Sequence, residues 1–150
     1  MNPIIDDRGI RIPEADLWLD ARDPVENCWI SHAHSDHAKP GHARVFASPH
    51  TLDLCRLRFG AAPANATALE WGRPVEFGAT RLTAFPAGHI LGAAQLLVEW
   101  EGQRLVYTGD IKVRDPLLGD PTVVVPCDHL IVESTFGLPI FQFLSAADAV

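Results

Sequence analysis

A group of metal-binding residue types directly after an apolar segment constrains this sequence more than any other feature. The segment Asn27–Ser31 is nearly all apolar, which is typical of a strand buried on both faces. It leads into an H-x-H-x-D-H pattern that contains His32, His34, Asp36 and His37. Because His32 and His34 alternate, an extended loop directs both imidazoles to the same side. The sequence therefore predicts a fold in which the end of a buried strand carries a metal site.

These four donors are too many for a single metal site that keeps room for water. Imidazole nitrogen and carboxylate oxygen bind zinc at about 2.0–2.2 Å, and a catalytic zinc retains an open position. Asp36 and His37 lie at a turn, from which they can face a second centre beside the first. We therefore expect two metal ions roughly 3.5–4 Å apart. The alternative is a polar loop of solvated histidines, but every donor is of a type that borderline metal ions prefer.

Two further candidate ligands lie where later strands are expected to end. His89 follows the alternating segment Arg81–Phe85, and Asp110 follows the segment Leu105–Thr108. Each is preceded by glycine, and each alone would be more typical of a turn. Both share the pattern of a strand end, a glycine and a ligand, so we expect them to complete the site, with the Asp110 carboxylate bridging both metals.

Strands dominate the rest of the pattern, with one clear helix. The helix is expected between Ser48, a favourable N-cap, and Gly60, which suits the left-handed position after the last turn. A second short helix is expected after His37. The residues Glu101–Gln103 predict a tight hairpin. Strands are expected at Asp16–Asp20, Asn27–Ser31, Arg81–Phe85, Leu96–Trp100, Arg104–Thr108 and Asp128–Glu133.

Composition excludes several classes of protein. The 150 residues contain 12 Lys and Arg against 19 Asp and Glu, so the net charge of −7 argues against a broad basic surface for nucleic acid. It does not argue against a cation-filled site. Apolar runs fall far short of the ~20 residues that a bilayer requires, so no membrane contact is expected. Three scattered cysteines and no signal-like N-terminus favour a reducing compartment, and we expect the cytoplasm.

The motifs, in their order, resemble the metallo-β-lactamase superfamily. Asp20, the His32–His37 run, His89 and Asp110 match the first four motifs of that family. The resemblance covers nearly the whole chain and implies an α+β fold, the N-terminal portion of an αββα sandwich. Residues 1–150 would then be the N-terminal part of the domain, cut before the insert that defines the β-CASP nucleases.

A finer resemblance involves four segments. Ile131–Gly137 is similar to the acidic motif that opens the β-CASP nucleases, a branch that includes the mRNA 3′-end-processing endonuclease. Pro86–Gln95, Val125–Asp128 and Thr135–Phe141 resemble the bacterial DNA-ligase-associated exonucleases. This implies a nucleic-acid partner, in particular single-stranded or frayed DNA, and a functional link to an ATP-dependent DNA ligase and to DNA repair.

The resemblance also implies a role for each candidate residue. It implies two Zn²⁺ ions, with Mn²⁺ as an alternative, and a catalytic part for Asp36, Asp110 and Glu133. One zinc would be held by His32, His34 and His89, the other by Asp36 and His37, with Asp110 shared. Asp20 would orient the ligand loop from behind the ligands. Glu133 would position a catalytic histidine from the later insert.

The expected function is a two-zinc phosphodiester hydrolase, a DNA exonuclease in its full-length form. Lys112 and Arg114 would position the nucleic-acid backbone, although a solvated loop face is the simpler interpretation of that pair. The alternatives are an RNA-processing β-CASP nuclease, a thioester or lactam hydrolase of the same fold, and an inactive metal-binding fragment. The residues Ser145–Asp148 look like a helix start two residues before the end, which indicates a piece of a longer protein or a frayed tail. In the family, another zinc-ligand histidine and the histidine that protonates the leaving group come from beyond residue 150.

Overall fold

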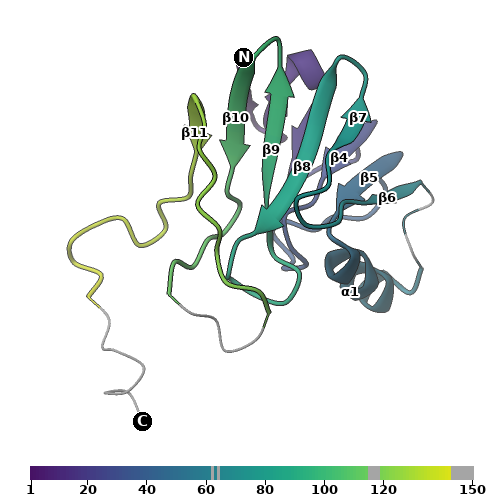
Figure 1. Cartoon of the computed structure of the whole chain (residues 1–150). Coiled ribbons are helices and arrows are strands. Elements are labelled where there is room, and N and C mark those ends of the chain that lie inside the picture. The colour runs from purple at the N-terminus through teal and green to yellow at the C-terminus, as the bar shows by residue number, and fades with distance from the viewer. Residues whose placement is uncertain (62, 64, 115–118, 143–150) are drawn as a thin grey trace.

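The computed structural model describes residues 1–61, 63, 65–114 and 119–142, which form two β-sheets and one α-helix (Figure 1). The first sheet contains six strands in sequence order: β1 (Ile4–Asp6), β2 (Gly9–Ile12), β3 (Leu17–Leu19), β4 (Asn27–Trp29), β5 (Arg44–Ala47) and β6 (Ala66–Ala68). The second has the order β11-β10-β9-β8-β7, formed by β7 (Val75–Phe77), β8 (Thr80–Pro86), β9 (Ala94–Trp100), β10 (Gln103–Tyr107) and β11 (His129–Ile131). A short 3₁₀ helix, Pro13–Ala15, joins β2 to β3.

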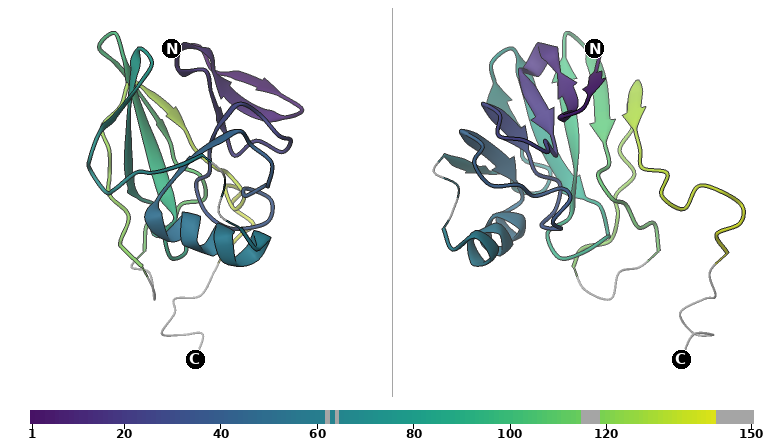
Figure 2. Two further views of the ribbon diagram at one scale, coloured as in Figure 1. Left: turned by 90° about the vertical axis from the view of Figure 1, so that its right-hand side faces the viewer. Right: turned by 180° about the vertical axis from the view of Figure 1, so that it is seen from behind.

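The two sheets pack face to face, and their inner faces form the main core (Figure 2, left). Alternation along each strand decides which side chains enter it. In β3 and β4, Leu19 and Trp29 face the second sheet, where they meet residues such as Leu96 of β9. Their neighbours Trp18 and Cys28 point to the opposite face of the first sheet and join a second cluster. Both faces of the first sheet are therefore buried at its centre.

The helix α1 (Pro49–Phe59) covers the outer face of the first sheet. Its boundaries follow the expected signals, because the hydroxyl of Ser48 accepts a hydrogen bond from the Thr51 amide at 3.2 Å and Gly60 has a left-handed φ of 76°. The Ser48 and Thr51 hydroxyls both donate to the carbonyl of Gly92, at 2.6 and 2.9 Å. The helix start is thereby tied to the loop that follows β8.

The expected strands are all present, although β3, β4 and β11 are shorter than the sequence pattern suggested. The hairpin between β9 and β10 forms where it was predicted, but its turn has two residues, because Gln103 pairs with Trp100; Glu101 and Gly102 have positive φ. The expected second short helix after His37 is wrong. A single turn forms, in which the Ala38 amide donates to the His34 carbonyl at 2.8 Å, and Pro40 prevents its continuation.

The layers observed are one helix, one sheet and a second sheet, in agreement with the N-terminal portion of an αββα sandwich. The helix start expected at Ser145–Asp148 lies outside the described residues. In the part of the chain that the structure describes, no helix combines the length and apolar character needed to cross a bilayer.

Candidate metal centre

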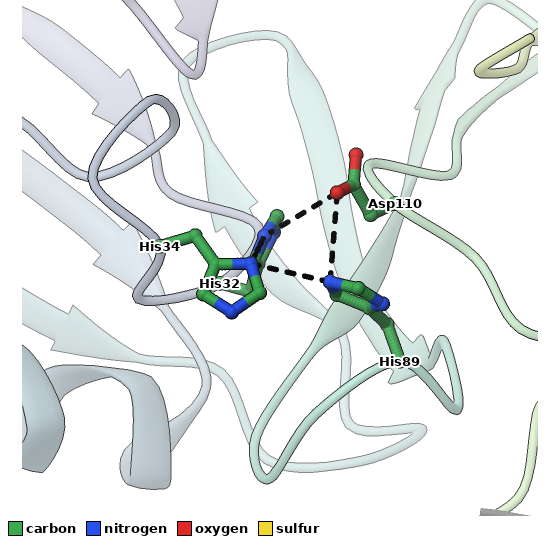
Figure 3. A group of neighbouring side chains, drawn as sticks. All are labelled: His32, His34, His89 and Asp110. Atoms are coloured by element: carbon green, nitrogen blue, oxygen red, sulfur yellow. Dashed lines mark hydrogen bonds and ion pairs between the residues drawn. The ribbon is translucent and has the colours of Figure 1, made fainter. Parts of the chain in front are cut away.

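Four of the six predicted metal ligands, His32, His34, His89 and Asp110, come together at one edge of the two sheets (Figure 3). Strands β8 and β10 are both antiparallel to β9, so they run in the same direction and end at the same edge. His89 follows β8 and Asp110 follows β10, while the histidine-rich loop follows β4 of the other sheet. Loops from both sheets therefore build the site, as the pattern of strand ends predicted.

The spacing of the first donor group fits one metal ion. His34 Nδ1 lies 3.0 Å from His32 Nε2 and 3.2 Å from His89 Nε2. Asp110 Oδ2 lies 3.7 Å from the same atom of His32 and 3.5 Å from that of His89. Donors arranged tetrahedrally around zinc at about 2.0–2.1 Å are about 3.3 Å apart. The donor set and its spacing therefore suit a zinc-like ion held by three imidazoles and one carboxylate.

A second group lies on the other side of Asp110. His37 Nε2 is 3.3 Å from Asp110 Oδ1 and 3.6 Å from Asp36 Oδ2. The two oxygens of the Asp110 carboxylate thus face different donor groups, which is the arrangement a bridging ligand requires. The Asp36 side chain is 77% exposed, so this group is more open to solvent than the first.

The buried carboxylate of Asp20 holds both groups in place. Its Oδ2 accepts hydrogen bonds from His37 Nδ1 at 2.7 Å, from the Tyr107 hydroxyl at 2.8 Å and from Ser31 Oγ at 2.6 Å. Because the Ser31 hydroxyl donates its proton there, His32 Nδ1, 3.0 Å away, must donate to Ser31 Oγ. In their neutral forms His32 and His37 then carry the proton on Nδ1 and present an unprotonated Nε2 to the site, the form in which imidazole binds a metal.

Burial and charge tune the protonation of the histidines differently. Burial, helped by the neighbouring imidazoles, lowers the pKa of His32 to about 3. Burial also lowers the pKa of His89, against the charge of Asp110, which raises it. For His37, burial lowers the pKa, but the hydrogen bond and charge of Asp20 outweigh it and the pKa is raised. His32 and His89 are therefore in the neutral form, which binds a cation, near neutral pH.

These shifts predict that the metal-free chain loses stability in mild acid. The pKa values of His32 and His89 lie below their unfolded value of about 6.5, so the unfolded state binds more protons as the pH falls below that value. The raised pKa of His37 has the opposite effect on stability. It stabilises the folded chain fully below about pH 6.5, and this stabilisation is lost as the pH rises. We expect the Tm of the chelated protein to fall steadily between about pH 6.5 and 4, measured by circular dichroism. A Tm that stays constant over this range would contradict the assigned protonation.

Glycine allows the Asp110 loop to approach the histidine loop closely. A Cβ on Gly109, whose φ is +55°, would lie 2.6 Å from Ser31 Cβ and 2.7 Å from Ser31 Oγ. Gly88 makes the equivalent approach beside His89, where a Cβ would lie 2.4 Å from the Lys112 carbonyl oxygen. A side chain at Gly109 would therefore separate the Asp110 loop from the histidine loop. A side chain at Gly88 would separate the His89 loop from the segment after Asp110.

Gly109→Ala is expected to destabilise the chain more than a glycine replacement with the same backbone angle in open space. Gly78 is the matched control, because its φ is +59° and a Cβ there meets nothing within 4 Å. Both variants carry the left-handed strain of about 1–2 kcal/mol, and only Gly109→Ala adds a clash of about 1–3 kcal/mol. Urea denaturation measures the difference. Equal losses in the two variants would mean that the Ser31 contact is not tight.

The structure places Glu133 beside the centre, in contact with the backbone. Its two carboxylate oxygens accept hydrogen bonds from the amides of Ile111, at 3.1 Å, and Thr135, at 3.3 Å. Burial raises the pKa of this carboxyl, but the hydrogen bonds from Thr135 and Ile111 outweigh it and the pKa is lowered. The ionised Glu133 therefore fastens the segment after β11 to the segment after Asp110.

Sequence reasoning missed three supporting residues. Ser31 and Tyr107 contact Asp20, and the anchoring of the His89 loop by Ser48 depends on α1. The only available signal was that Ser31 and Tyr107 stand close in sequence to candidate ligands. Contacts of this kind depend on how the sheets dock, which a local pattern does not reveal.

Comparison with known proteins identifies the family. A family model described as a β-lactamase superfamily domain matches residues 2–138. A probable DNA ligase from Opitutus terrae is 36% identical over 144 residues, which are 95% of this chain and 14% of the ligase. Cleavage and polyadenylation specificity factor subunit 3 from Dictyostelium discoideum is 37% identical over 76 residues, 49% of this chain and 10% of that protein. An RNase J-like protein from Methanocaldococcus jannaschii is 45% identical over 58 residues, 37% of this chain and 14% of that protein.

The lengths of these relatives differ greatly from that of the chain, which spans no more than 14% of any of the three. The family model, by contrast, covers nearly every described element, from β1 to β11. It confirms the resemblance on which the predicted fold rested. On this evidence the chain belongs to the β-lactamase superfamily, in the metallo-β-lactamase group that its histidine and aspartate motifs resemble.

Proposed function

We propose that this chain provides the two-metal centre of a phosphodiester hydrolase that trims DNA ends in connection with ligation and repair. One observation carries the hydrolase part of the proposal. The carboxylate of Asp110 directs one oxygen to the His32, His34 and His89 group and the other to His37 and Asp36. A shared carboxylate between two donor groups is the arrangement of two-metal hydrolytic sites.

In this proposal His32, His34, His89 and Asp110 hold one Zn²⁺, and Asp36, His37 and Asp110 hold the other, with Mn²⁺ as an alternative. Such ions lower the pKa of water and offset the negative charge of a phosphoryl group when they are bound. The chain's own residues supply the geometry. Asp20 keeps the Nε2 atoms of His37 and, through Ser31, of His32 directed at the site. Since those nitrogens are fixed before substrate arrives, little reorganisation accompanies the reaction.

The choice of DNA rests on the relatives. The protein named as a probable DNA ligase matches 95% of this chain, whereas the RNase J-like protein matches 37% of it. A segment similar to this chain within a protein named as a probable DNA ligase suits the removal of damaged or frayed ends before they are sealed. The RNase J-like relative supports a second candidate, an RNA-processing nuclease built on the same centre.

The test is hydrolysis by the protein as encoded, including any residues beyond Val150. End-labelled single-stranded DNA is expected to be degraded stepwise when Zn²⁺ or Mn²⁺ is supplied, and His34→Ala should abolish the activity. His50→Ala is the matched control, because His50 is exposed on the first turn of α1. Faster cleavage of RNA of the same sequence would overturn the DNA assignment, and cleavage of a thioester instead of either would overturn the nuclease proposal.

A further inference from the structure

A large cavity opens directly beside the candidate metal centre. It has a volume of about 910 Å³, and His89 and Asp110 form one end of it. The rest of its wall comes from the segment after Asp110, which contains Lys112 and Arg114, and from the segment after β11. This volume is at the upper end of the range for pockets that bind small molecules. A group bound here would lie against the atoms that face the metals.

Two aromatic rings also line this cavity. Phe136 and Phe141 lie with ring centroids 5.4 Å apart and an angle of 77° between their planes. Their exposed fractions are 60% and 44%, although burying an aromatic ring is strongly favourable. The two rings therefore present an aromatic surface to whatever occupies the cavity.

The aromatic pair is held in a defined position relative to the metal ligands. Glu133 connects its segment to Ile111, next to Asp110, through the two backbone hydrogen bonds described above. The Phe141 amide donates to the Leu138 carbonyl at 3.0 Å, which closes the turn that brings the two rings together. These hydrogen bonds fix the position of the Phe136 and Phe141 pair relative to the Asp110 carboxylate.

Two cations, Lys112 and Arg114, belong to the wall of the same cavity. The Lys112 amide donates to the Ala87 carbonyl at 2.9 Å, and the Thr122 hydroxyl contacts the Lys112 carbonyl at 2.5 Å. This backbone is therefore fixed to the His89 loop, while the Lys112 and Arg114 side chains are exposed. On this cavity wall Lys112 and Arg114 offset the carboxylates of Asp110 and Glu133, so a phosphate meets less repulsion here than elsewhere on a chain with a net charge of −7.

We propose that this cavity is a base-stacking subsite for a single nucleic-acid strand. Phe136 and Phe141 stack a base next to the scissile phosphate, and Lys112 and Arg114 pair with backbone phosphates. This rests on the proposed function, because it places the scissile phosphate at Asp110. The bases of a duplex have both faces covered by their neighbours, so a platform of this kind selects unpaired strands. A protein partner would explain the exposed rings but not the cations or the shared wall with the metal ligands.

Binding in the absence of hydrolysis tests this subsite. The protein as encoded is titrated, with a chelator present, into a fluorescein-labelled thymidine 12-mer and into the same backbone without bases. We expect the base-free strand to bind about tenfold more weakly, as the loss of one stacked base predicts. Phe136→Leu and Phe141→Leu should weaken binding of the thymidine strand and leave the base-free strand unchanged. Phe59→Leu, on α1, is the matched control.

The part played by Lys112 and Arg114 is measured separately, from the salt dependence of binding. Lys112→Gln and Arg114→Gln should each weaken both strands and reduce the slope of log affinity against log salt by about 0.7. Equal binding of the thymidine and base-free strands, or of a duplex and a single strand, would overturn the subsite. RNA and DNA single strands of the same sequence are compared in parallel, and base-dependent binding of either one supports it.

Hydrolysis is scored independently with Mn²⁺. Base-dependent binding that the two phenylalanine variants remove, without hydrolysis of any phosphodiester, would support the subsite and reject the proposed function. Hydrolysis that neither variant changes, with no dependence of binding on bases, would reject the subsite and leave the proposed function standing.

Discussion

Replacing Asp110 by asparagine is expected to lower phosphodiester hydrolysis by on the order of a thousandfold or more. The substitution keeps the size of the side chain but leaves only one oxygen, so one donor group loses its shared ligand. The Oδ2 contacts with His32 and His89 and the Oδ1 contact with His37 cannot both survive as charged contacts. Rates with saturating Mn²⁺ and the metal content of the purified protein, measured by mass spectrometry, give the two readouts.

Asp53→Asn serves as the control for this experiment. Asp53 is exposed on α1, so its replacement removes the same charge without contact with the centre. We expect it to retain activity and metal content. If Asp110→Asn also retained both, the bridging role would belong to another carboxylate.

Asp20→Asn is expected to lower the free energy of unfolding by about 3–5 kcal/mol, the usual cost of breaking a buried charged network. The Asp20 carboxylate accepts from the Ser31 amide, the Ser31 hydroxyl, Tyr107 and His37. An amide has one oxygen, so at least one of these donors must face an NH₂ group. Urea denaturation of the metal-free protein measures the loss, and metal titration measures the accompanying fall in affinity.

Tyr107→Phe is the comparison for Asp20→Asn. It deletes one donor to the same carboxylate oxygen, and the expected loss is about 1 kcal/mol. A similar loss in the two variants would show that Asp20 is not the centre of the network.

The local elements follow closely from the sequence. The helix Pro49–Phe59 begins and ends where Ser48 and Gly60 predict, because capping is decided by a few neighbouring residues. The hairpin at Glu101 and Gly102 is local in the same sense. The helix expected after His37 does not form, for an equally local reason: Pro40 has no amide donor and restricts the backbone of Lys39.

The sequence predicted that the candidate ligands converge, but not which residues hold them in place. A glycine and a ligand after a strand can be recognised one segment at a time, and the structure brings His89 and Asp110 to the histidine loop. The contacts of Asp20 with Tyr107, 87 positions later, require the docking of two sheets. The same holds for Glu133, whose partners Ile111 and Thr135 could not be chosen from sequence.

The distribution of the donors along the chain also determines when a metal can be captured during synthesis. His32 and His34 emerge from the ribosome first, but the atoms that complete their group belong to His89 and Asp110, on loops of the other sheet. A nascent chain that ends before Asp110 offers only part of the donor set and has no shared carboxylate. Capture of a metal would thereby be coupled to the docking of the two sheets, and each bound ion would stabilise the folded chain against the unfolded one.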